Sequence, residues 1–170
     1  MAHEGSGWEP PREGCVKFNV RGYFDASRDT RSCGGIARNH NGKIVARFMY
    51  RPPAGSSSLT TELWAILWAL KVARDLDLKE VEVECECTEA VKATGEGVDG
   101  NQPDVDVVND IMNRLKSDGW EVEVKECNRD QNKAADALAQ YASSMVTNLH
   151  VIYERGQSSA TTQQQESGDE

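Results

Sequence analysis

Three short segments with period-two alternation follow one another near the start of this chain, and they restrict the fold more than any other feature. In the first, residues 15–24, apolar residues alternate with polar ones, which is typical of a half-buried strand. Two more such segments, residues 33–39 and 43–50, lie on either side of Asn41-Gly42, and Asn-Gly is a strong signal for a tight hairpin. The sequence therefore predicts an antiparallel three-stranded meander.

The rest of the chain alternates between helical and strand patterns. Apolar residues recur at helical spacing over about residues 59–76. The later predicted elements are a strand at 81–87, a short helix at 88–94, a helix that opens at Asp104 and stops at Asp118-Gly119, a strand at 120–127 and a last helix at about 133–145, burying Ala134, Leu138, Tyr141 and Met145. Strands that follow helical crossovers are expected to lie parallel to the first strand. The predicted fold is α/β, with a five-stranded mixed sheet in the order β-β-β-α-β-α-α-β-α flanked by helices.

Three regions differ in composition, and a length of 170 residues favours one folded domain. Residues 1–13 are rich in Gly, Pro and charge and are expected to form a flexible lead-in, from which Trp8 is able to dock on the sheet. Residues 14–148 are expected to form the folded domain. Residues 149–170 are expected to form a disordered acidic, Gln- and Ser-rich tail, because most of that stretch has little to bury.

The charge balance bears on nucleic-acid binding, and the cysteines bear on the redox compartment. There are 19 basic and 28 acidic residues, a net charge of −9, which argues against strong non-specific binding to nucleic acid. Five cysteines without a CxxC pair favour free thiols in a reducing compartment. Neither a membrane-length apolar run nor a hydrophobic N-terminal stretch is present, so we expect an intracellular protein, nuclear or cytoplasmic, that is not secreted.

Five segments carry a family resemblance when they are taken in order. They are residues 16–22 (VKFNVRG), 41–45 (NGKIV), 61–66 (TELWAI), 81–87 (VEVECEC) and 132–139 (NKAADALA). Together with the order of the elements, they resemble the plant reverse-transcriptase-like branch of type 1 ribonuclease H, over roughly residues 14–145. The resemblance implies a ribonuclease H-like fold for the domain at 14–148.

The resemblance also implies a site. In that family four carboxylates hold two Mg²⁺ ions, which activate a water and stabilise the leaving oxygen when the RNA strand of an RNA–DNA hybrid is cleaved. Matched position by position, the first carboxylate falls at Arg21, the second at Glu62, the third at Glu86 and the fourth at Asp136. The family usually has Asp at the first and third of these positions.

Arg21 is the departure with the largest consequence, because an arginine offers no acceptor to a metal and repels a cation. Asp25 lies about 13 Å further along an extended strand and cannot take its place. We hypothesise that Arg21 stands in for the metals and forms an ion-pair cluster with Glu62, Glu86 and Asp136. The alternative is that Arg21 points to solvent and leaves a weak one-metal site.

The favoured interpretation is a ribonuclease H-like domain with a degenerate metal site. It would be a catalytically impaired module that binds nucleic acid or a protein, and no metal is expected to be bound. One alternative is an active endonuclease that uses Mg²⁺ or Mn²⁺ at Glu62, Glu86 and Asp136 to cleave RNA–DNA hybrids. A further alternative is a protein-binding scaffold with no affinity for nucleic acid. The expected partners are an RNA–DNA hybrid or structured RNA bound weakly, or a protein, and not a membrane. The chain is expected to be a monomer.

Overall fold

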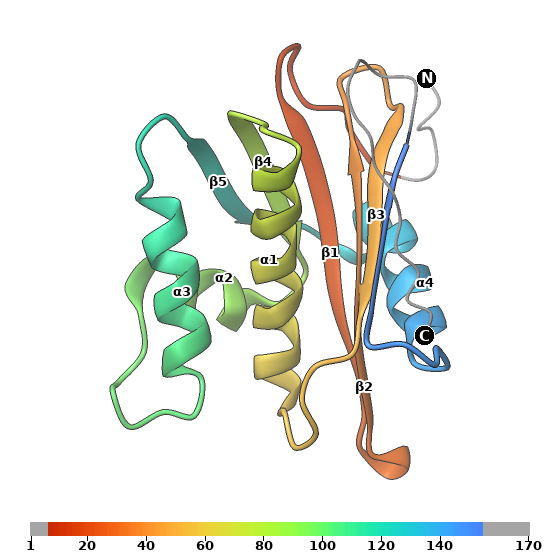
Figure 1. Cartoon of the computed structure of the whole chain (residues 1–170), viewed down its shortest axis with the longest axis vertical. Coiled ribbons are helices and arrows are strands. Elements are labelled where there is room, and N and C mark those ends of the chain that lie inside the picture. The colour runs from red at the N-terminus through yellow and green to blue at the C-terminus, as the bar shows by residue number, and fades with distance from the viewer. Residues whose placement is uncertain (1–6, 155–170) are drawn as a thin grey trace.

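A mixed six-stranded sheet forms the centre of the molecule, in the order β5-β4-β1-β2-β3-β6 (Figure 1). The structure is a computed structural model, and it describes residues 7–154. The predictions made for residues 1–6 and 155–170 lie outside the described residues.

The elements follow the predicted order closely. The strands are β1 (Val16–Asp25), β2 (Thr30–Arg38), β3 (Ile44–Tyr50), β4 (Glu80–Cys85), β5 (Glu121–Glu126) and β6 (Leu149–Tyr153), and the helices are α1 (Ser58–Asp75), α2 (Thr88–Glu96), α3 (Val105–Leu115) and α4 (Lys133–Ala142). Single 3₁₀ turns cover Ala26–Arg28 and Arg129–Asn132. The mixed α/β fold that the sequence predicts is confirmed.

The directions of the strands also agree with the prediction. β1 pairs antiparallel with β2, and β2 pairs antiparallel with β3, so the meander is present. Its second turn is closed at Gly42, where φ is +79° and the backbone N–H donates to the carbonyl of Asn39 at 2.9 Å. β4 lies parallel to β1, and β5 lies parallel to β4.

A sixth strand corrects the predicted count of five. β6 pairs antiparallel with β3, from Ala46 opposite Tyr153 to Tyr50 opposite Leu149. The prediction had placed residues 149–153 at the start of a disordered tail, although Leu-His-Val-Ile-Tyr is rich in the β-branched and aromatic residues that favour strands. Five residues are too few for a period-two pattern to be distinguished from a short apolar run.

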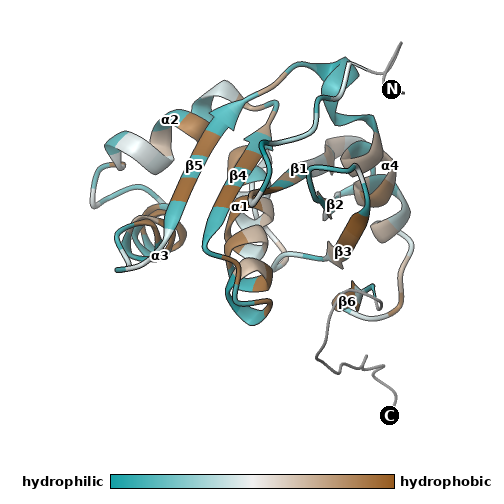
Figure 2. Ribbon diagram, turned by 90° about the horizontal axis from the view of Figure 1, so that it is seen from above, coloured by the Kyte–Doolittle hydropathy of each residue, from teal (hydrophilic) through white to brown (hydrophobic). Residues whose placement is uncertain are grey.

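The two faces of the sheet carry different helices. In β2 the thiol of Cys33 lies against the carbonyl of Thr61 in α1, whereas the hydroxyl of the neighbouring Ser32 donates to the carbonyl of Ala139 in α4. Because successive residues of a strand point to opposite faces, α1 and α4 lie on opposite sides of the sheet. β4 and β5 alternate along their length between hydrophobic and hydrophilic residues (Figure 2).

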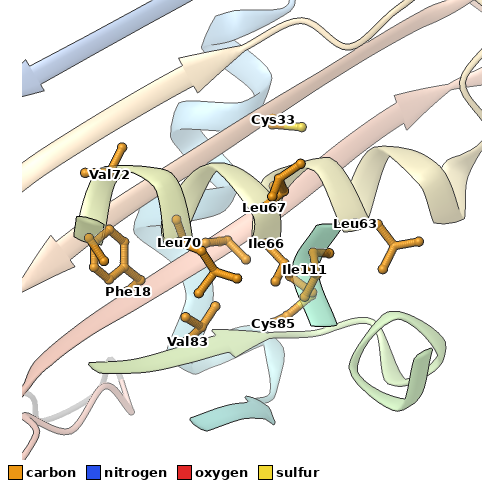
Figure 3. Close-up of a cluster of buried hydrophobic side chains, with 14 of the residues drawn as sticks. Phe18, Cys33, Leu63, Ile66, Leu67, Leu70, Val72, Val83, Cys85 and Ile111 are labelled. Carbon is orange, nitrogen blue, oxygen red and sulfur yellow. The ribbon is translucent and has the colours of Figure 1, made fainter. Parts of the chain in front are cut away.

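The main core lies between α1 and the sheet. Phe18, Leu63, Ile66 and Leu70 are completely buried there (Figure 3). Ile111 of α3 is completely buried in the same cluster. α1 is therefore buried against two elements, the sheet and α3, as the width of its apolar face predicts.

α4 approaches β2 very closely. A Cβ atom added at Gly34 would lie 2.3 Å from the backbone nitrogen of Ala139, so glycine is required for this contact. The completely buried residues of α4 are the small ones, Ala135, Ala139 and Ala142. The prediction that Tyr141 is buried was wrong: 66% of it is exposed, because a large side chain does not fit between α4 and β2.

In the described part of the N-terminal segment, residues 7–13, two side chains are buried and the others are exposed. Trp8 and Pro11 are buried. The Trp8 indole N–H donates to Oδ1 of Asn19 at 2.9 Å, and the guanidinium of Arg38 lies over its ring at 4.1 Å. Trp8 therefore docks on the sheet, and it does so on the face that carries α4.

All five cysteines are free thiols. Among the described residues, no helix combines the length and the apolar character that a membrane crossing needs.

Candidate functional site

The candidate site forms where β1 extends past the end of β4. The last residue pair between these strands is Val20 with Cys85, whereas β1 continues to Asp25. Beyond Val20, the edge of β1 is therefore free on the side of β4, and other elements approach it there. Arg21 and Gly22 occupy this free edge.

Four elements bring the four sequence-predicted residues to this edge. Arg21 comes from β1, Glu62 from the N-terminal part of α1 and Asp136 from the first turn of α4. Glu86 follows β4 directly, one residue beyond the strand, although the sequence prediction extended that strand to Cys87.

Arg21 lies between the two helices and pairs with a carboxylate from each. Its Nη1 lies 3.1 Å from Oε2 of Glu62, and its Nε lies 3.2 Å from Oδ1 of Asp136. Its side chain is 29% exposed, whereas that of Glu62 is 6% exposed. Arg21 thus forms ion pairs with Glu62 and Asp136 and does not point away from the site.

Glu62 is a buried carboxylate with donors on both oxygens. Besides Arg21 on Oε2, the backbone N–H of Gly22 donates to Oε1 at 2.8 Å, and the thiol of Cys85 lies 3.8 Å from the same oxygen. Burial raises the pKa of Glu62 above its ordinary value, and the charge of Arg21 and the bond from Gly22 oppose that rise.

The guanidinium is stabilised in its charged form. Burial by itself disfavours the charge of Arg21, but the nearby carboxylates of Glu62, Glu86 and Asp136 outweigh that effect and raise the pKa of Arg21. With one cation and three carboxylates, the cluster keeps an excess of negative charge.

Gly22 allows α1 to approach the strand. A Cβ atom added there would lie 2.6 Å from the backbone nitrogen and 2.7 Å from the Cα of Glu62. Gly22→Ala is therefore expected to push the first turns of α1 off β1 and to cost roughly 2–3 kcal/mol of unfolding free energy, at the upper part of the range for overpacking. Chemical denaturation measures this cost, with Gly95→Ala as the control, because a Cβ at Gly95 has no neighbour within 4 Å. Equal stabilities of the Gly22 and Gly95 variants would contradict the close approach.

Glu86 is held by a neighbouring amide and not by the arginine. The side-chain N–H₂ of Asn132 donates to Oε2 of Glu86 at 3.2 Å and to the carbonyl of Val20 at 2.9 Å. Asn132 in turn accepts from Asn19 at 3.1 Å, and Asn19 accepts from Trp8. A buried polar chain thus runs from the N-terminal segment to the candidate site.

Asp136 stands at the border of an open groove. Its Oδ2 accepts from the side-chain amide of Gln140 at 2.9 Å, and its side chain is 34% exposed. The groove has a volume of about 490 Å³, and its lining residues are Arg129, Asp130, Lys133, Asp136, Ala137 and Gln140.

The arrangement does not fit a pair of divalent cations. Both oxygens of Glu62 and both of Asp136 already accept hydrogen bonds from protein donors, and Arg21 supplies donors alone. Within residues 7–154, there is no group of three or more His, Cys, Asp or Glu side chains placed to hold a metal ion. What these residues do as arranged is to neutralise one another partly, with a guanidinium at the centre.

The sequence identified the charged residues of the site but not the groups that complete it. Three contributions were missed: the backbone N–H of Gly22 on Glu62, the amide of Asn132 on Glu86 and the amide of Gln140 on Asp136. The spacing of Asp136 and Gln140, one helical turn apart, was a signal for the third. The other two depend on contacts between distant elements.

Comparisons with known proteins agree with this fold. Residues 19–142 match the family described as reverse transcriptase-like. A curated protein of Arabidopsis thaliana, named "putative ribonuclease H protein", is 28% identical over 144 residues, which make up 85% of this chain. The matched part is 23% of that protein, so this chain spans about a quarter of the length of its curated relative.

Solved ribonuclease H structures share the architecture. Ribonuclease H1 from the archaeon Halobacterium salinarum matches with a TM-score of 0.65 and 22% identity, over 75% of this chain and 96% of that one. LC11-RNase H1, in its complex with an RNA/DNA hybrid, matches with a TM-score of 0.65 and 16% identity, again over 75% and 96%. At such identities the likeness shows the fold, and the fold is the predicted ribonuclease H-like one.

Proposed function

This chain is a ribonuclease H-type domain and belongs to the reverse transcriptase-like family, and we propose that it binds RNA–DNA hybrids weakly without cleaving them. In this proposal the ion-pair cluster of Arg21 occupies the place where the family resemblance implies two metal ions. The domain would retain hybrid binding through its fold but lack metal-dependent hydrolysis.

The proposed loss of hydrolysis rests on one observation, the position of Arg21 between Glu62 and Asp136. A divalent ion entering the site would have to displace the guanidinium and would then lie beside a fixed positive charge. Two cations at such short range repel each other strongly where little water screens them. The cluster therefore favours a metal-free state.

Hybrid binding is supported by the fold and by two cations next to the site. Arg129 and Lys133 line the groove that borders Asp136, where they are able to contact phosphates. A protein that shares this fold, LC11-RNase H1, has been solved in complex with a hybrid.

We expect weak binding because Lys133 already lies 3.9 Å from Oδ1 of Asp130 and because three arginines of the meander are engaged elsewhere. Arg31 bonds Asp29 and the carbonyl of Ser56, Arg38 stacks on Trp8, and Arg47 pairs with Glu154. The net charge of −9 acts against phosphate binding in the same direction. A dissociation constant of micromolar order or weaker is expected near physiological salt.

The test uses a fluorescently labelled RNA–DNA hybrid and the full chain. In the presence of Mg²⁺ or Mn²⁺ we expect a rise in anisotropy with protein concentration and no cleavage product on a denaturing gel. With two phosphate contacts, log K should fall with log salt with a slope of about −2. Arg129→Ala and Lys133→Ala should each weaken binding, whereas Arg28→Ala, at an exposed turn residue, is the matched control.

Two results would overturn the proposal in different ways. Cleavage of the hybrid by the unmodified chain in Mn²⁺ would show that the chain is an active endonuclease. A lack of any change in anisotropy up to about millimolar protein, well beyond the usual range for non-specific binding, would leave the reading of a protein-binding scaffold.

A further inference from the structure

The outermost strand of the sheet, β6, is paired on one side. Within residues 7–154 it contacts β3 and is the last strand in the sheet order. Backbone hydrogen bonds fix the ladder to β3 at both ends. The N–H of Arg51 donates to the carbonyl of Asn148 at 2.8 Å, and the N–H of Glu154 donates to the carbonyl of Val45 at 3.0 Å. Figure 2 shows β6 at the outer end of the sheet, beyond β3.

The register decides which backbone groups of β6 point outward. In an antiparallel pair, hydrogen-bonded residues alternate with residues whose backbone groups point away from the partner strand. Since Asn148 and Glu154 bond to β3, His150 and Ile152 do so too. The three residues of odd number between them, at 149, 151 and 153, therefore direct their N–H and C=O groups to the open edge.

This open edge lacks the protection that the opposite edge of the sheet has. β5, at the other end, carries Glu121, Glu123, Lys125 and Glu126 within six residues. Such charges discourage edge-to-edge pairing. β6 is Leu-His-Val-Ile-Tyr, without an acidic residue, lysine, arginine or proline. It presents free backbone groups next to side chains with high strand propensity.

We propose that β6 is a self-association strand, which pairs antiparallel with β6 of a second copy about a two-fold axis at Val151. A two-fold axis at this residue places Val151 opposite itself and Leu149 opposite Tyr153 of the second copy. All three outward-facing residues then meet hydrogen-bonded partners, which gives six new backbone bonds. The two sheets join into one continuous sheet.

The charges at the ends of the strand fit this arrangement. In the same register Glu154 lies opposite Asn148 of the second copy, so its carboxylate does not face its own symmetry mate. Glu154 is also paired with Arg47 of its own chain at 2.6 Å. Leu149 is 39% exposed and gains a cross-strand neighbour in Tyr153 of the second copy.

The second copy fits better than an unrelated strand because the edge is complementary to itself. The sequence predicted a monomer without a sixth strand, whereas β6 supplies a surface for association. One strand pair buries little area, so the association is expected to be weak, with a dissociation constant of the order of 10 µM to 1 mM.

Amide hydrogen exchange of the full chain tests the proposal at single residues. On going from dilute to concentrated protein, the amides of Leu149, Val151 and Tyr153 should become at least tenfold more protected. Those of His150 and Ile152 point to β3 in either state and serve as the internal control. Sedimentation analysis over the same range should show conversion of monomer to dimer.

A proline variant tests the same strand pairing independently of hydrogen exchange. Val151→Pro removes an outward-facing N–H and no bond to β3, and proline is tolerated on such edges. It should remain folded and sediment as a monomer at every concentration. Val146→Ser, at a side chain that is 95% exposed but lies before β6, should dimerise like the unmodified chain.

Several outcomes would overturn the proposal. They are a monomer throughout the range, protection of the three amides that does not change with concentration, and a dimer that survives Val151→Pro. Loss of the dimer in Val146→Ser would instead assign association to exposed apolar side chains. If the proline variant does not fold, amide hydrogen exchange in the unmodified chain is sufficient to test the proposal.

Discussion

Arg21→Asp is expected to give a chain that cleaves RNA–DNA hybrids in Mn²⁺, whereas the proposed function predicts no cleavage by the unmodified chain. The substitution removes the guanidinium and places a fourth carboxylate beside Glu62, Glu86 and Asp136. Such a set of hard oxygen ligands is what a pair of divalent ions requires. If the ions contribute about 3 kcal/mol of transition-state stabilisation, cleavage should rise by roughly 10²-fold above the background of the unmodified chain.

A second readout does not depend on catalysis. Without metal, four neighbouring carboxylates repel one another, so the Arg21→Asp chain should melt below the unmodified chain. Mn²⁺ at ten times its dissociation constant should then stabilise the variant by about 1.4 kcal/mol. The unmodified chain should show no such stabilisation.

Arg21→Asn is the matched control for this prediction. It has the shape of the aspartate but carries no charge, so it removes the arginine without completing the ligand set. It should neither cleave the hybrid nor gain stability from Mn²⁺. Equal cleavage by the unmodified, Asn and Asp chains would show that residue 21 does not control the site.

Arg21→Met is expected to be strongly destabilising. It leaves Glu62, which is 6% exposed, without its counter-charge, and it also removes the partner of Asp136. Removing one partner of a buried pair typically costs about 3–5 kcal/mol, and the partial exposure of Arg21 and Asp136 reduces this to about 2–3 kcal/mol near neutral pH. Urea denaturation of the two chains measures the difference.

The free energy of unfolding that Arg21→Met loses should decrease as the pH falls. The pKa of Glu62 is raised in the folded chain by burial and held back by Arg21, so it rises further in Arg21→Met. A carboxyl with a raised folded pKa stabilises the fold at low pH, and this stability is lost as the pH rises through that pKa. The gap between the two chains is therefore largest near neutral pH and narrows as the pH falls toward 4.5, the ordinary pKa of this carboxyl.

Arg114→Met is the control for the effect of burial. Arg114 is 28% exposed, which matches the 29% of Arg21, but its partner Asp110 is 43% exposed. An exposed pair one helical turn apart contributes about 0.3–0.5 kcal/mol. If the two methionine variants lose equal stability, or if the loss at Arg21 does not change with pH, then Glu62 does not depend on Arg21.

The sequence predicted the meander and the helical crossovers because these leave local signals. Alternation, the Asn-Gly turn and helical periodicity act over a few residues and need no knowledge of distant contacts. The four site residues were implied by the family resemblance, which led to the hypothesis of a cluster of Arg21 with Glu62, Glu86 and Asp136. In the structure Glu86 accepts a hydrogen bond from Asn132 and not from Arg21.

The features that the sequence did not reveal depend on packing between distant segments. The burial of alanines in α4 in place of Tyr141 follows from the absence of a side chain at Gly34, which lies in another element. The hydrogen-bond partner of Trp8 is the buried Asn19, which lies in β1. β6 forms because β3 offers an edge, and the five residues of β6 by themselves do not indicate that edge.

The most direct test of the account is a titration of the unmodified chain with Mn²⁺, followed by nuclear magnetic resonance. Because Mn²⁺ is paramagnetic, a bound ion broadens the signals of nearby nuclei, here the backbone amides of Gly22 and Glu62. The account predicts no selective broadening of these amides up to millimolar Mn²⁺, whereas the Arg21→Asp chain should show it. Selective, saturable broadening at Gly22 and Glu62 in the unmodified chain at millimolar or lower Mn²⁺ would contradict the claim that Arg21 occupies the place of the metals.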